Sequence, residues 1–139
     1  MNAQSLKWHP SALADLKAIF EYCSTSFGRK TARDVRNKLV CTAELLCANP
    51  FLGPIEPLLK DCTSLEYRSL VANNYTKIIY TVHADYVYIH LLWNVRQNEE
   101  RISKITASRY ALFNQEHNNT VNEPPVIYGN LVEEERGKI

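Results

Sequence analysis

The sequence predicts an α+β domain: an N-terminal αα-hairpin on a small, mainly antiparallel sheet of about four strands, followed by a C-terminal helix and a tail. Three observations support this fold class. Apolar residues recur at three- and four-residue spacing in the first third of the chain, they alternate with polar residues over 65–93, and the helical period returns after residue 98. A chain of 139 residues suits a single domain.

The N-terminal third is expected to form one short strand and two helices. Residues 5–8 alternate apolar and polar side chains, which predicts a strand. Helical spacing predicts one helix over residues 10–24, with Ser11 as its cap, and a second over residues 29–48. Gly28 separates them, so the two helices form an αα-hairpin. The apolar positions of the second helix share one face: Ala32, Val35, Leu39, Ala43 and Leu46.

The middle of the chain predicts a loop and then three strands. NPFLGPIEP at 49–57 has three prolines and one glycine in nine residues, a composition typical of a loop. Residues 65–71, 75–82 and 86–93 are rich in tyrosine, isoleucine and valine, with turn-forming residues between them. They predict a three-stranded antiparallel meander.

The C-terminal part predicts a third helix and a polar tail. EERISKITASRYALFN (99–114) regains the helical period and has two glutamates where the helix dipole favours them. We expect a domain over 1–113 and a flexible acidic extension over 114–139. The first part has 14 lysines and arginines against 10 acidic residues, a net charge of +4, and the extension has 2 against 5, a net charge of −3. A mildly basic body is compatible with a polyanionic partner.

Composition excludes several classes of protein. No apolar run approaches the roughly 20 residues that span a bilayer, and the N-terminus has no apolar core of the signal-peptide kind, so we expect a cytoplasmic protein. The cysteines form no CxxC pair, and the four histidines have no HxxxH or HxH spacing. We therefore expect no metal site and no cofactor. The four thiols are expected to be reduced and mostly buried: Cys23, Cys41, Cys47 and Cys62.

Alternation along the strands predicts which side chains share a face of the sheet. Val87, Ile89, Leu91 and Trp93 are expected to pack on the helices. The opposite face is expected to stay uncovered and to carry a set of basic and aromatic side chains: Arg68, Lys77, Tyr88, His90 and, past Trp93, Arg96.

Two interpretations of this face remain open. Basic groups, a tyrosine and a histidine suit phosphates and stacked bases, which would make the face an RNA-binding surface. Antiparallel sheets also commonly have one solvated face that carries charge without any function. On the second interpretation His90 is a surface residue of its strand rather than a catalytic acid, and the two tryptophans belong to the core.

Several segments also carry a family pattern. These are HPSALADLKAIFEY in the first helix, the NPFLGP loop, and the run YRSLVANNYTKIIYTVHADYVYIHLLWNVRQN over the three strands. In these segments, over roughly residues 5–103, the chain resembles toxins of the RelE/ParE superfamily, the stable partners in type II toxin–antitoxin operons. The resemblance implies two helices against a small antiparallel sheet and a cognate antitoxin as partner.

The resemblance implies one of two activities. RelE-like toxins cleave mRNA on the ribosome, whereas ParE-like toxins poison DNA gyrase and need no catalytic residues. In the RelE-like pattern Lys77, Arg96 and, more loosely, Arg68 match the basic residues that neutralise the phosphate, with Tyr88 and His90 beside them for RNA contact. These three basic residues favour an mRNA-cleaving enzyme.

One departure keeps the alternatives open. RelE-like toxins usually carry a tyrosine or histidine where this chain has Ile102, so a general base is missing from the pattern. A gyrase inhibitor without catalytic activity is therefore the second hypothesis, with its determinants on the helical hairpin or near the C-terminus. A non-toxic module that only sequesters an antitoxin is the third. The acidic residues 133–135 are a candidate for folding back over the basic face.

Overall fold

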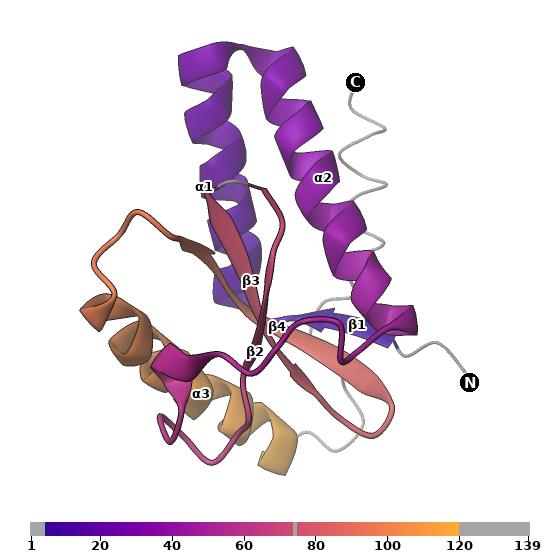
Figure 1. The fold of residues 1–139 in the computed structure, drawn as a ribbon, viewed down its shortest axis with the longest axis vertical. Helices are drawn as coiled ribbons and strands as arrows, with labels where there is room; N and C mark the ends of the chain where they lie inside the picture. The colour runs from indigo at the N-terminus through magenta and orange to yellow at the C-terminus, as the bar shows by residue number, and fades with distance from the viewer. Residues whose placement is uncertain (1–4, 74, 120–139) are drawn as a thin grey trace.

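A computed structural model of the chain describes residues 5–73 and 75–119, and its fold is the predicted α+β class (Figure 1). Within these residues, three helices, one 3₁₀ turn and four strands follow one another. They are β1 (Ser5–Trp8), α1 (Pro10–Phe27), α2 (Arg29–Ala48), the turn η1 (Pro57–Leu59), β2 (Arg68–Val71), β3 (Thr76–Val82), β4 (Tyr86–Asn94) and α3 (Glu100–Asn119).

The four strands form one mixed sheet with the order β1-β4-β3-β2. The predicted meander is confirmed, since β2, β3 and β4 pair antiparallel, and β1 joins the free side of β4 in parallel. The predicted first meander strand is shortened, because β2 begins only at Arg68. Just before it, the Tyr67 carbonyl accepts the N–H of Glu56, so the chain there runs beside the preceding loop.

The αα-hairpin is confirmed, but the cap of its first helix differs from the prediction. The N-cap is His9, whose Nδ1 accepts the Ser11 N–H at 2.9 Å, while Pro10 occupies the first turn and needs no acceptor. Helix α1 continues to Phe27, beyond the predicted end. Gly28 joins the helices at φ 97°, a conformation that glycine adopts without the steric cost of a Cβ atom.

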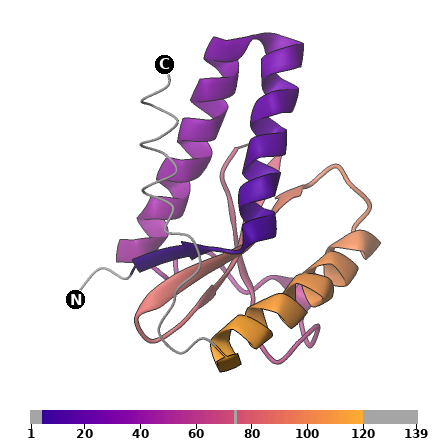
Figure 2. The same ribbon diagram turned by 180° about the vertical axis from the view of Figure 1, so that it is seen from behind.

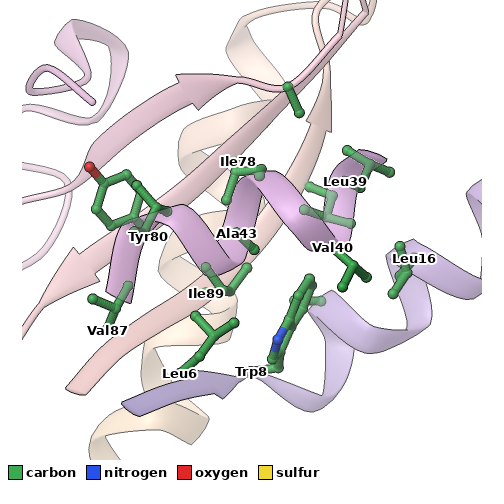
Figure 3. Close-up of a cluster of buried hydrophobic side chains, with 14 residues drawn as sticks. Leu6, Trp8, Leu16, Leu39, Val40, Ala43, Ile78, Tyr80, Val87 and Ile89 are labelled. Carbon is green, nitrogen blue, oxygen red and sulfur yellow. The ribbon is translucent and has the colours of Figure 1, made fainter. Parts of the chain in front are cut away.

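The main hydrophobic core lies between the hairpin and one face of the sheet. Figure 3 shows side chains of β1, β3 and β4 meeting those of α1 and α2. Its buried members are Leu6, Trp8, Ala12, Leu16, Leu39, Val40, Ala43, Leu46, Ala72, Ile78, Tyr80, Val87, Ile89 and Leu92. The face of α2 predicted to be apolar packs into this core.

A second core lies on the opposite face of the sheet, beneath α3 and the turn η1 (Figure 2). Its buried members are Leu59, Tyr67, Ile79, Leu91, Trp93 and Ile102. The prediction of an uncovered face is therefore wrong, because the third helix lies across it. Both tryptophans are buried, as predicted, although Trp93 belongs to this second core.

A β-bulge explains why Trp93 changed sides. Tyr80 pairs with Ile89 but Ile79 pairs with Leu91, so His90 is an extra residue in β4. Before the bulge Val87 and Ile89 face the hairpin, and after it Leu91 and Trp93 face α3. The predicted alternation is correct up to Ile89 and reversed from Leu91 onward.

Helix α3 passes the boundary predicted between residues 113 and 114, since it continues to Asn119. The acidic residues 133–135 lie outside the described residues. All four cysteines are free, but only Cys23 is buried, so the prediction of mostly buried thiols is wrong. Within residues 5–73 and 75–119, no helix has both the length and the apolar character that crossing a membrane requires.

Candidate functional site

Arg68 is tied to the loop that follows α2. Its Nη1 donates to the Gly53 carbonyl at 2.9 Å, and its guanidinium lies 4.8 Å from the ring centre of Phe51. Arg68 pairs directly with Tyr80, so it lies on the hairpin side of the sheet. A longer ion contact of 3.7 Å joins it to the exposed Glu66.

The same loop is anchored by the buried hydroxyl of Tyr80. This hydroxyl accepts the Gly53 N–H at 2.9 Å and donates to the Pro50 carbonyl at 2.8 Å. A Cβ atom on Gly53 would lie 2.3 Å from the Ser69 carbonyl oxygen, so only glycine fits this approach. Burial raises the pKa of Tyr80. The NPFLGP motif therefore has a structural explanation in holding the loop on β2 and β3.

Lys77 lies on the other side of the sheet and forms an ion pair with a buried carboxylate. Its Nζ is 2.8 Å from Oε1 of Glu56, a residue that is only 1% exposed. Burial acts to raise the pKa of Glu56, but hydrogen bonds, the first of them from Lys77, outweigh it and hold this pKa below its usual value. Lys77 is thus the counter-ion of a buried acid.

Arg96 lies in the turn after β4 and is exposed. Its guanidinium stacks 3.9 Å from the ring centre of Tyr75, and its backbone N–H is bound by Oδ1 of Asn94. Arg96 also lines a groove together with residues of α1. It therefore lies on the hairpin side of the molecule.

The three basic residues do not share one face, contrary to the prediction. Arg68 on β2 pairs with Tyr80 on β3, so these two side chains share a face. Lys77 is three residues before Tyr80 on β3, so the side chains of Lys77 and Arg68 point to opposite faces. The bulge at His90 breaks the alternation that would have placed Arg96 beside Lys77. Their catalytic roles stay a prediction, but the geometric premise of one shared surface is wrong.

Tyr88 and His90 are also not on an open surface. Both are fully buried beneath α3, with their ring centres 4.6 Å and 5.1 Å from that of Phe113. Nε2 of His90 lies 2.8 Å from Oγ1 of Thr81, which also contacts His83 at 2.7 Å. Burial raises the pKa of Tyr88 far above its usual value. In this structure neither side chain can reach a nucleic acid.

An open groove lies between the hairpin and the ends of β3 and β4. It has a volume of about 740 Å³, and side chains of α1, α2 and the turn after β4 form its walls. The lining residues that bear on binding are Asp15, Ile19, Tyr22, Phe27, Tyr75 and Arg96.

Exposed aromatic rings mark this groove. Tyr22 is 65% exposed, Phe27 is 63% exposed and Tyr75 is 47% exposed, and the first two rings contact each other edge to face at 6.2 Å. Exposed aromatics with a neighbouring arginine are typical of protein-binding surfaces. Tyr22 was not predicted because it lies off the apolar stripe of α1, and Phe27 because it follows the predicted end of that helix at residue 24. The signal available was two aromatic residues within two turns of Gly28 at the hairpin tip.

Over residues 5–73 and 75–119, no three or more histidine, cysteine, aspartate or glutamate side chains gather where they could hold a metal ion.

A family model described as "ParE toxin of type II toxin-antitoxin system, parDE" matches residues 6–100, about two thirds of the sequence. The chain belongs to this family. The resemblance to the RelE/ParE superfamily drawn from the sequence is thereby confirmed.

Two solved structures are similar to this chain, and the first of them shares its fold. A chain of the chromosomal ParDE TA system from P. aeruginosa has 22% identity and a TM-score of 0.56, over 66% of this chain and 96% of that chain. A chain of the YoeB-YefM complex from Staphylococcus aureus has 19% identity and a TM-score of 0.44, over 65% of this chain and 94% of that chain. Among curated proteins no match was found.

Proposed function

We propose that this toxin stops growth by binding DNA gyrase through its hairpin groove, without cutting RNA itself. The observation that carries the proposal is the dispersal of Arg68, Lys77 and Arg96, set against a groove that exposes aromatic side chains. The family match supports a toxin of a type II system. The choice of DNA gyrase as its target is our own inference.

RNA cleavage needs several groups around one phosphate. A base must activate the 2′-hydroxyl, cations must neutralise the developing charge, and an acid must protonate the leaving oxygen. Here Lys77 is engaged by Glu56, and Arg68 by the Gly53 carbonyl on the other face of the sheet. Ile102, which stands where RelE-like toxins have a tyrosine or histidine, is buried and cannot act as a base. Tyr110, a tyrosine farther along α3, has its hydroxyl bonded to Ser64 at 2.8 Å. These engagements favour a non-catalytic mode of action.

The groove has the features of a surface that binds protein. Aromatic and arginine side chains contribute most of the binding energy at many interfaces, because they bury large areas at modest cost in conformational entropy. Figure 1 shows the far end of the hairpin projecting beyond the sheet, where it can reach into a partner. An antitoxin with an amphipathic or extended segment is expected to cover the same groove and so neutralise the toxin.

The test follows thymidine and amino-acid incorporation after induction in a bacterial host, together with supercoiling by purified gyrase. We expect DNA synthesis to fail first and gyrase to be inhibited. Tyr22→Ala with Phe27→Ala should relieve both effects, because the rings are exposed and their loss leaves the core intact. Leu45→Ala, an exposed apolar residue of α2 outside the groove, is the matched control.

The same experiment identifies the alternatives. If protein synthesis collapses first and Lys77→Ala or Arg96→Ala restores it, the chain is an mRNA interferase and the proposal is wrong. If neither synthesis falters, the chain is a non-toxic module that binds an antitoxin.

A further inference from the structure

A polar cluster joins α3 to α1 and β4. The two guanidinium nitrogens of Arg109 lie 2.6 Å and 3.0 Å from the two carboxylate oxygens of Asp15. Nη1 of Arg109 also donates to the His90 carbonyl at 3.0 Å, and Oδ2 of Asp15 accepts the Leu92 N–H at 3.1 Å. Each member of the ion pair therefore also forms a hydrogen bond with the backbone of β4.

The ion pair of Asp15 and Arg109 lies beside the part of β4 that extends past the end of β1. β1 ends at Trp8, and the His9 N–H makes the last backbone contact to β4, at the Ile89 carbonyl. Among the described residues, no strand pairs with β4 beyond Ile89 on the side of β1. Asp15 and Arg109 supply the acceptor and the donor that a neighbouring strand would otherwise provide.

His9 completes the cluster through its two ring nitrogens. Nδ1 accepts the Ser11 N–H, so the proton of the neutral ring sits on Nε2, which donates to the Arg109 carbonyl at 3.0 Å. His9 is 1% exposed. His9 and Asp15 thus hold Arg109 by its backbone and by its side chain. We call His9, Asp15 and Arg109 the α3 latch.

Apart from the latch, α3 docks through a small set of apolar side chains, and the ring contacts of Phe113 with Tyr88 and His90 are among them. Its buried apolar side chains are Ile102 and Phe113, with Ile105 partly buried. A weak thiol hydrogen bond from Cys62 to the Ser103 carbonyl at 3.3 Å adds to these contacts. The family match also ends at residue 100, where α3 begins, so the matched segment does not include this helix.

We propose that the α3 latch is sensitive to protons: protonation of His9 releases α3 from the sheet while the hairpin and the sheet stay folded. His9 is 1% exposed, so with α3 docked a charged ring would have almost no contact with water. The positive charge of Arg109 also disfavours a charged ring. These two effects outweigh the stronger hydrogen bond that a charged ring would donate to the Arg109 carbonyl, and so they oppose docking of α3.

The other charged groups around His9 act in known directions. The Arg109 carbonyl on α3 and the carboxylate of Asp15 on α1 favour the charged ring, while the positive charge of Arg109 opposes it. Tyr88 on β4 presents its ring edge at 6.3 Å, and its hydroxyl is bonded to Glu116 on α3. Burial is the largest influence and lowers the pKa of His9 below its usual 6.5. Docking is therefore strongest at neutral pH and weakens as the pH falls through 6.5, because the released state takes up the proton more readily.

Release of α3 would uncover an aromatic face of the sheet. The side chains beneath α3 include Tyr67, Tyr88, His90 and Trp93, all of them 3% exposed or less in the docked state. The latch thus controls access to a surface that is chemically unlike the hairpin groove. This inference does not depend on the target proposed above.

Hydrogen–deuterium exchange of the purified full chain tests the latch. Peptides from α3 are compared with peptides from α1 and β4 at about pH 7.5 and about pH 5.5, after correction for the intrinsic exchange rate. We expect exchange in α3 to rise about tenfold in acid, which corresponds to a loss of about 1.4 kcal/mol in the docking free energy, with exchange in the hairpin and the sheet unchanged.

Three variants identify the titrating group. His9→Asn keeps a good N-cap but cannot titrate, so α3 should exchange faster at neutral pH and show no further rise in acid. Arg109→Gln should open α3 at both pH values, while Arg101→Gln, an exposed arginine on the same helix, is the matched control. His83→Asn, which alters a second histidine that contacts Phe113, should keep the acid response.

Several outcomes would overturn the proposal. These are equal α3 exchange at both pH values, an acid response that survives His9→Asn, or one that disappears with His83→Asn. Acid-induced exchange of the hairpin and sheet together with α3 would also contradict it, because the helix would then not open as a separate unit.

Discussion

The two faces of the sheet are covered in different ways. The hairpin face is packed almost entirely with aliphatic and aromatic side chains, drawn mainly from β1, α1, α2, β3 and β4. The α3 face combines a smaller apolar cluster with imidazoles, tyrosine hydroxyls and two ion pairs, Lys77–Glu56 and Arg109–Asp15. Apolar burial scales with area and tolerates changes of pH, whereas buried polar contacts depend on every partner being present. We therefore expect the hairpin face to provide most of the stability of the fold and the α3 face to respond to changes of pH.

The largest expected effect belongs to the hairpin face. Leu39→Ala removes a fully buried side chain from the centre of that core and should lower the free energy of unfolding by about 2–5 kcal/mol. Denaturant unfolding followed by circular dichroism measures this, with exposed Leu45→Ala on the same helix as control. A loss below about 1 kcal/mol would show that the hairpin does not dominate stability.

The next effect is on the α3 face and concerns charge. Lys77→Met leaves the carboxylate of Glu56 buried without its cation, which should cost about 2–3 kcal/mol, less than a fully enclosed pair because Lys77 is 26% exposed. The double variant Lys77→Met, Glu56→Gln should recover much of this loss. Equal destabilisation in both variants would contradict the role of Glu56.

The same ion pair predicts a pH dependence. The folded chain holds the pKa of Glu56 below its usual 4.5, so this contribution to stability is present above pH 4.5 and is lost as the pH falls through the lowered value. Unfolding of the native chain and of Glu56→Gln at a series of pH values measures it. The two stability curves should converge in acid, and curves that stay parallel would exclude Glu56 as the titrating group.

A smaller effect is expected at the loop on the hairpin side. Gly53→Ala would bring a methyl group to within 2.3 Å of the Ser69 carbonyl, and the backbone must shift to relieve this contact. We expect a loss of about 1–3 kcal/mol in the free energy of unfolding. Ala14→Gly, at an exposed position of α1, also changes the side chain by one methyl group and serves as the comparison. Its expected loss in the free energy of unfolding is at most about 1 kcal/mol.

The smallest effect on global stability is expected within α3. Ile102→Ala removes a buried side chain, as Leu39→Ala does, but from a helix that can open on its own. Global unfolding should therefore shift by less than about 1 kcal/mol, while amide exchange in α3 rises. A global loss equal to that of Leu39→Ala would show that both faces unfold as one unit.

The sequence predicted the elements of the fold well because each is a local pattern. Helical spacing placed α1 and α2, and turn residues separated the three strands of the meander. The face of the sheet on which Trp93 lies was not predictable, because alternation of side chains assumes regular pairing and His90 is an extra residue in β4. Nothing in the local pattern marks that insertion.

The candidate site was less predictable, for a related reason. Lys77 and Glu56 are 21 residues apart in sequence, and Asp15 and Arg109 are 94 residues apart, so neither pair forms a local motif. The family resemblance was recognisable from motifs, but motifs give residue types rather than directions. Arg68 and Lys77 occupy neighbouring strands and still point to opposite faces.

The bulge at His90 has a consequence for how this chain can change over time. In strand β4 the odd-numbered positions contribute to the hairpin core up to Ile89 and to the α3 core from Leu91 onward. Losing or gaining a single residue between them would send Leu91 and Trp93 to the hairpin and Leu92 to α3. Single substitutions in β4 change one side chain at a time, whereas the insertion or deletion of one residue would exchange the two faces of the strand beyond that point.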